Sequence, residues 1–155
     1  MIIRLADWIF QVDREQTERY TIGCSSDHCM CAYCRNYYET VDLAHPTLRP
    51  FLKQFGAVIE GPSEVMPLEP TLVLVCYRIT GQILQTGTKI HVDGVPIHPE
   101  PGDGETFLLW AGQMQLPWAQ NEPEEDVISP ANQPEFLQRM QEKWAQLNGF
   151  EIIYS

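Results

Sequence analysis

Apolar and polar residues alternate along the first part of the chain, which is the pattern of a strand with one buried face. The alternation covers residues 2–12 and changes phase at Ala6 and Asp7, so we expect a bend or a bulge there. The polar stretch 13–16 predicts a turn, and residues 19–22 predict a short strand that pairs back on the first. The chain should therefore begin with two strands.

Helical spacing of apolar residues begins near Cys31 and continues up to Pro46, which would end a first helix. Ser26 or Asp27 is the expected N-cap of this helix. A second helix is predicted over residues 48–55 because its apolar positions repeat at intervals of three and four. Its boundary residues should be Thr47 as the N-cap, Pro50 in the first turn and Gly56 after the last turn.

A nearly continuous apolar run at residues 72–79 is rich in β-branched side chains and predicts a central strand that is buried on both faces. Asp93 and Gly94 stand between alternating apolar residues, which predicts a hairpin over residues 89–98. Pro96 has no backbone N–H, so its arm of the hairpin should lie at the edge of the sheet.

Strands outnumber helices in this pattern, and they do not alternate strictly with them. The remaining expectations are a short strand at 57–59, a loop at 61–70, a strand at 105–110, a loop at 117–134, a helix capped by Asn132 and a closing strand at 150–154. We therefore predict a single α+β domain over residues 1–155. A mostly antiparallel β-sheet would carry two or three helices on one face or end, plus a Cys-rich loop leading into a helix.

Charge narrows the possible partners. The chain of 155 residues has 21 acidic and 10 basic side chains and a net charge of −11. Such a chain repels phosphate backbones and anionic lipids, so no nucleic-acid partner and no membrane partner is expected. The start of the chain lacks a signal-peptide pattern, and residues 72–77 are too few to span a bilayer. These features predict a cytoplasmic protein.

Four of the five cysteines fall within residues 24–34, which form the candidate metal-binding loop. The predicted ligands are Cys24, Cys29, Cys31, Cys34 and His28. In a reducing compartment such a cluster favours thiolate chemistry over disulfides. Structural zinc takes four Cys or His ligands, and Cys-x2–4-Cys is its usual half-site. The cluster therefore predicts a structural zinc ion, with one of the five candidates left over.

Other chemistries fit the same spacing. Cys31 and Cys34 form a C-x-x-C pair at the start of a helix, where a thiol pKa is lowered, so a thiol–disulfide or metal-handling redox site is an alternative. Four thiolates can also hold an iron–sulfur cluster. The simplest alternative is a set of reduced cysteines without any ligand. Cys76 lies in the apolar run and is expected in the core.

Residues 29–37 read C-x-C-x-x-C-R-N-Y. This run resembles a motif in small bacterial proteins that have no assigned activity. The resemblance covers about a tenth of the chain and implies neither a mechanism nor a ligand.

No nucleophile elbow, phosphate-binding loop, dinucleotide fingerprint or HExxH motif occurs in the sequence. We therefore predict a non-enzymatic binding or accessory protein with a structural zinc site. A second alternative is an acidic immunity or inhibitor protein that binds a basic partner. Its contact residues would be Trp118 and the acidic stretch 122–126 (Glu122, Glu124, Glu125 and Asp126).

Overall fold

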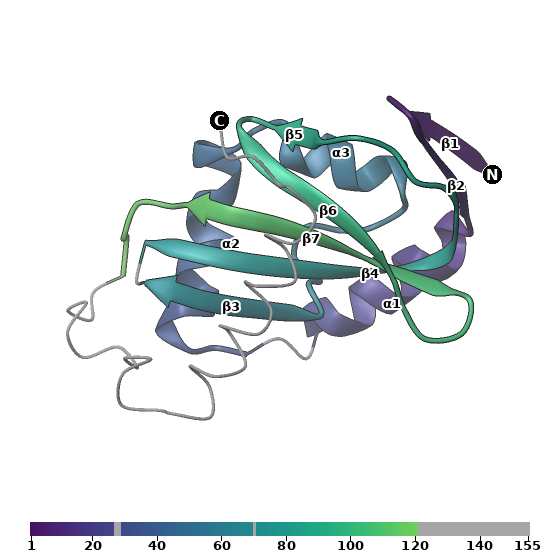
Figure 1. Cartoon of the computed structure of the whole chain (residues 1–155). Helices are drawn as coiled ribbons and strands as arrows, with labels where there is room; N and C mark the ends of the chain where they lie inside the picture. Colours follow the sequence, from purple (N-terminus) through teal and green to yellow (C-terminus); the bar gives the residue numbers. More distant parts are fainter. Residues whose placement is uncertain (27–28, 70, 121–155) are drawn as a thin grey trace.

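The computed structural model describes residues 1–26, 29–69 and 71–120 (Figure 1). In chain order the elements are β1 (Ile2–Leu5), β2 (Trp8–Val12), α1 (Arg14–Ser26), α2 (Ala32–Ala44), α3 (Leu48–Gln54), β3 (Glu64–Glu69), β4 (Leu72–Gln85), β5 (Ile90–Val92), β6 (Val95–Pro101) and β7 (Thr106–Gln115). The α+β prediction is confirmed. The predicted last helix and closing strand fall in residues 121–155, outside the described residues.

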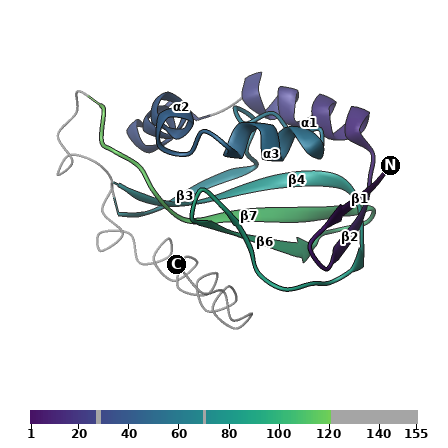
Figure 2. The ribbon, with the colours of Figure 1, turned by 90° about the horizontal axis from the view of Figure 1, so that it is seen from above.

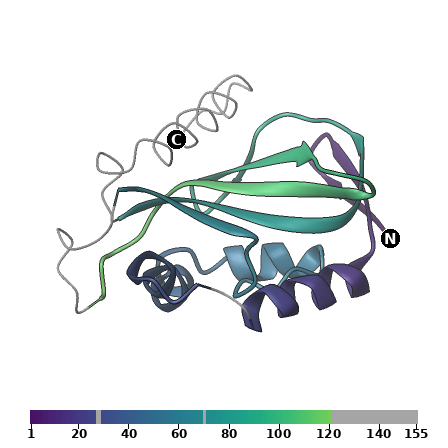
Figure 3. The same cartoon turned by 90° about the horizontal axis from the view of Figure 1, so that it is seen from below.

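The strands form one antiparallel sheet in the order β1-β2-β4-β7-β6-β5, and β3 pairs with β4. Helices α1, α2 and α3 cover the same face of this sheet (Figures 2 and 3). β4 is the central strand, as the apolar run predicted, and it pairs with β2, β3 and β7. The fold is therefore a helical layer on a single curved sheet.

Side chains of β4 alternate between two apolar clusters because successive residues of a strand face opposite ways. Val75, Tyr77 and Ile79 belong to the main core beneath the helices. Leu74 and Cys76 belong to a smaller cluster with Met66, Leu68, Leu108 and Trp110. Cys76 is 2% exposed, which confirms its predicted place in the core.

The hairpin prediction is confirmed, with one correction. Asp93 and Gly94 have φ values of 52° and 77°, the left-handed region that a two-residue hairpin turn needs. However, β6, the arm that carries Pro96, pairs with both β5 and β7 and is not an edge. The edge is β5. Pro96 is tolerated because the β6–β7 pairing begins one residue later, at Ile97.

The predicted turn and short strand over residues 13–22 are wrong, because this segment is helix α1. Its inward-facing residues are Thr17 and Thr21, both fully buried, so the helix has no apolar stripe to read. The Thr17 hydroxyl accepts a hydrogen bond from Thr80 N at 3.0 Å, and the Thr21 hydroxyl accepts one from Val58 N at 3.1 Å. These two hydrogen bonds attach the helix to β4 and to the segment that follows α3.

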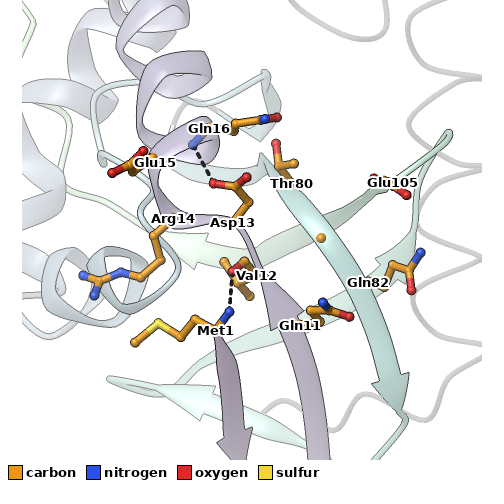
Figure 4. A pocket seen from close by; sticks show the side chains of 11 residues that line it. Met1, Gln11, Val12, Asp13, Arg14, Glu15, Gln16, Thr80, Gln82 and Glu105 are labelled. Atoms are coloured by element: carbon orange, nitrogen blue, oxygen red, sulfur yellow. Dashed lines mark hydrogen bonds between the residues drawn. The ribbon is translucent and has the colours of Figure 1, made fainter.

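Helix α1 begins after Asp13, whose carboxylate accepts a hydrogen bond from Gln16 N at 3.0 Å (Figure 4). This is an N-cap of the usual kind. At the other end, Ser26 is the last residue of α1 and so does not cap α2. The N-cap of α2 is Cys31, without a side-chain capping bond, and Asp27 lies outside the described residues.

Three further predictions, for residues 2–12, 57–59 and 64–69, differ from the structure. Residues 2–12 form a hairpin with a turn at Ala6 (φ 50°), not one bent strand. Residues 57–59 are not a strand, although Ala57 and Ile59 are buried. Residues 64–69 form strand β3, predicted as loop because of Pro67. Among the described strands β3 pairs only with β4, so a missing N–H is tolerated on its other side.

Two buried tyrosines connect the helical layer to the sheet. Tyr37 and Tyr77 are both 0% exposed, their hydroxyls are hydrogen-bonded to each other, and the Tyr77 hydroxyl donates to Ile59 O at 2.6 Å. Burial is the main reason that the pKa of each phenol is raised, so both stay neutral. The chain of bonds therefore runs from Tyr37 through Tyr77 to the backbone.

Tyr77→Phe is expected to lower the free energy of unfolding by at least about 2 kcal/mol, because it leaves both the Tyr37 hydroxyl and Ile59 O without this partner. Tyr37→Phe removes only the hydrogen bond between the two hydroxyls and should lower the free energy of unfolding by about 1 kcal/mol. Urea denaturation of the two variants measures the difference. Equal losses would show that Tyr77 does not link the two bonds.

Candidate metal centre

The connection between α1 and α2 positions the cysteine sulfurs. Cys24 lies in the last turn of α1, Cys29 precedes α2, Cys31 is the N-cap of α2 and Cys34 is in its first turn. Cys31 N donates a hydrogen bond to Cys29 Sγ at 3.4 Å, and Cys34 follows Cys31 by about one helical turn. The short spacing of Cys29, Cys31 and Cys34 is therefore enough to gather their sulfurs.

The Sγ atoms of Cys29, Cys31 and Cys34 all lie within 4.8 Å of one another. Tetrahedral zinc with bonds of about 2.3 Å places sulfur atoms about 3.8 Å apart, so small side-chain adjustments would bring the three to one ion. Burial increases along the group: Cys29 is exposed, Cys31 is half-buried and Cys34 is 8% exposed. Within the described part of the chain, this is the group of three or more Cys, His, Asp or Glu side chains that can share an ion.

The other two predicted ligands are placed differently. Cys24 is half-buried and stands outside the group of three, although it lines the same surface hollow as Cys29 and Cys34. His28 lies outside the described residues. The structure thus brings three of the five predicted ligands together and leaves a fourth, Cys24, beside them.

The hollow next to the sulfurs has a volume of about 480 Å³. Its walls come from α1, from the start of α2 and from the start of β3, and they include Arg19, Tyr38 and Glu64. Sequence reasoning did not identify Tyr38 as part of this site. The available signal was its position four residues after Cys34, which places both on one face of a helix.

Hydrogen bonds within the cluster separate the acidities of two thiols. A hydrogen bond from Cys34 is the main cause that lowers the pKa of Cys31 to about 5, assisted by backbone N–H groups at the start of α2. The same bond, together with burial, raises the pKa of Cys34 well above its usual range. Without a metal, the shared proton therefore stays on Cys34, and Cys31 is a thiolate at neutral pH.

Two tyrosines respond to this negative charge. Burial raises the pKa of Tyr33, and the Cys31 thiolate raises it further. Burial is also the main cause that raises the pKa of Tyr38, and the negative charge of the neighbouring cysteine cluster raises it further. Both phenols are therefore neutral neighbours of the cluster.

The first two turns of α2 also hold the segment that follows β7. The Asn36 side chain donates to Pro117 O at 3.0 Å and accepts from Ala119 N at 2.8 Å. Arg35 Nε donates to Gln120 Oε1 at 3.2 Å, and its guanidinium also donates to Met30 O beside the cysteines. The cysteine cluster and the end of the described chain thus share one short helical stretch.

Trp118, predicted as a contact residue for a basic partner, is half-buried and packs edge-on against Tyr33, with ring centroids 6.1 Å apart. The acidic stretch 122–126 lies outside the described residues. Binding of a basic partner through these residues stays a prediction. No helix in the described ranges has the length and apolarity needed to cross a membrane.

A second hollow, of about 520 Å³, lies where β2 leads into α1 (Figure 4). Two of its charged groups have structural partners: Asp13 caps α1, and the N-terminal ammonium donates to Val12 O at 3.2 Å. It offers no ligand set comparable to the three sulfurs.

Comparisons with protein-family models, with curated proteins and with solved structures give no match to this chain.

Proposed function

We propose that this protein binds one zinc ion through Cys29, Cys31 and Cys34, with Cys24 or His28 as the fourth ligand. The observation that carries the proposal is the mutual approach of the three sulfurs to within 4.8 Å. Thiolates are soft donors that select zinc, Cu(I) and iron–sulfur clusters over magnesium or calcium. Zinc is the member of that group most often held by short Cys loops.

The role proposed for the ion is structural. With Cys24 as the fourth ligand, the ion would connect the end of α1 to the start of α2. The main core lies beneath the helices and includes none of the grouped cysteines. The protein would act as a non-enzymatic binding or accessory protein in the cytoplasm, where cysteines remain reduced.

Elemental analysis tests this proposal directly. Protein purified without a metal-binding tag or chelator is expected to contain about one zinc per chain, released when the thiols are blocked with a mercurial reagent. The Cys76→Ser variant is the matched control, because Cys76 lies in the apolar cluster of the sheet and should not affect zinc content. Protein that holds no zinc after incubation with excess zinc would contradict the proposal.

A second candidate function is thiol–disulfide exchange by Cys31 and Cys34. It is favoured by the lowered pKa of Cys31, the property expected of an attacking thiol. In that reaction the Cys31 thiolate would attack a partner's disulfide, and one partner sulfur would leave as a thiolate. Cys34 would then displace the second, so that the partner gains two electrons and the C-x-x-C pair becomes a disulfide.

The pH dependence of alkylation measures this property. Because the pKa of Cys31 is lowered to about 5, metal-free protein should react with iodoacetamide at Cys31 with a midpoint near pH 5, whereas an ordinary thiol needs a pH near 8.5. Cys34→Ala removes the main hydrogen-bond donor and should move the midpoint towards the ordinary value. Mass spectrometry of peptides locates the label. A midpoint that Cys34→Ala leaves unchanged would count against the coupling of the two thiols.

A further inference from the structure

A third hollow, called the cavity below, lies away from the cysteines, where the sheet curls. The connection from β4 to β5, residues 86–89, runs past β2 before it reaches β5 (Figure 1). It is attached there by side chains: Trp8 Nε1 donates to Thr88 O at 2.6 Å, and Thr88 Oγ1 donates to Asp7 Oδ2 at 3.2 Å. These bonds join the β1–β2 side of the sheet to the segment leading to its other edge, so that the sheet partly closes on itself.

The cavity inside this curl has a volume of about 440 Å³. Its apolar lining residues come from β2, β4, β5 and β6, and they are Trp8, Ile83, Ile90, Ile97, Pro99 and Pro101. Trp8 and Ile90 are each 7% exposed, and Ile97 is 4% exposed. The volume falls within the range of about 300–1,000 Å³ that is usual for small-molecule sites, which are also mainly apolar.

The wall formed by residues 86–89 is fixed by close packing. A Cβ atom on Gly87 would lie 2.7 Å from Trp8 N, so only a glycine allows this approach. Gln85 Nε2 adds a bond of 2.7 Å to Asp7 O just before this segment. The cavity is thus formed before any ligand arrives, which lowers the entropic cost of binding.

The charges around the cavity balance. Its lining includes one cation, Lys89, and one carboxylate, Glu100, which accepts a hydrogen bond from Trp110 Nε1 at 3.0 Å. His98 also lines the cavity and is 6% exposed. A charged ligand would be attracted by one of these two groups, repelled by the other, and would lose its hydration on entry. An uncharged ligand gains apolar contact without repulsion or the cost of desolvating a charge.

We propose that this cavity is a binding site for a small, uncharged, mainly apolar organic molecule. Trp8 forms one wall, and the isoleucines of β4, β5 and β6 form the others. The proposal is independent of the metal centre, because none of its lining residues is a candidate zinc ligand.

The neutral fluorescent probe N-phenyl-1-naphthylamine tests this proposal on the full chain. Its emission should rise and saturate with protein concentration. Ile83→Asn, which places an amide in the lining, should weaken binding about tenfold. Leu84→Asn is the matched control: Leu84 neighbours Ile83 on β4, is 51% exposed and does not line the cavity, so the affinity should not change.

A measurement on the unaltered protein keeps the test decisive if Ile83→Asn does not fold. Nuclear Overhauser effects from probe protons should reach the methyl groups of Ile83, Ile90 and Ile97. Overhauser effects confined to other methyl groups, an absence of saturable binding, or an equal loss of affinity in Leu84→Asn would each overturn the proposal.

Discussion

Cys34→Ser is expected to reduce the affinity for zinc by at least about 100-fold. Changes to residues that only orient a metal ligand already cost about 10- to 100-fold in affinity, and removal of a ligand should cost more. Cys34 is the most buried of the three grouped cysteines, so water cannot easily replace its sulfur. Competition with a chromophoric chelator measures the affinity of each variant.

Cys76→Ser controls for the loss of a buried thiol elsewhere, because Cys76 is similarly buried but faces the smaller apolar cluster. Its zinc affinity should equal that of the unaltered protein. Cys24→Ser adds a graded test: a loss as large as that of Cys34→Ser would identify Cys24 as the fourth ligand. If Cys34→Ser bound zinc as tightly as Cys76→Ser does, the grouped sulfurs would not be the metal site.

Phe10→Ala is expected to lower the free energy of unfolding by about 3–5 kcal/mol, the usual cost of removing a fully buried phenyl ring. Phe10 is 0% exposed and lies at the centre of an aromatic group. Its ring centroid is 5.7 Å from that of Trp8, 5.3 Å from Phe55 and 5.2 Å from Phe107. These three neighbours belong to β2, to the end of α3 and to β7, so a cavity at Phe10 weakens contacts across the layers.

Urea denaturation measures this loss, and Leu84→Ala is the control. Leu84 is 51% exposed, so its truncation should change stability by less than about 0.5 kcal/mol. A loss below 1 kcal/mol for Phe10→Ala would show that the aromatic group does not organise the core.

Sequence patterns predicted the elements whose signals are local. The apolar run predicted β4, Asp93 and Gly94 predicted the hairpin, and helical spacing predicted α2 and α3. The grouping of Cys29, Cys31 and Cys34 is also a local matter, because six consecutive residues at a helix start cannot separate far. A chain with these spacings encodes such features without reference to the rest of the fold.

Only the tertiary structure decided the features that depend on distant partners. Helix α1 has no apolar stripe, since its inward-facing residues are Thr17 and Thr21. The Thr17 hydroxyl bonds to the backbone of Thr80, 63 residues away, and the Thr21 hydroxyl bonds to that of Val58, 37 residues away. The half-buried position of Trp118 depends in the same way on Tyr33. Hydrophobic periodicity records which side chains avoid water, but it does not record which polar groups find each other after the chain has folded.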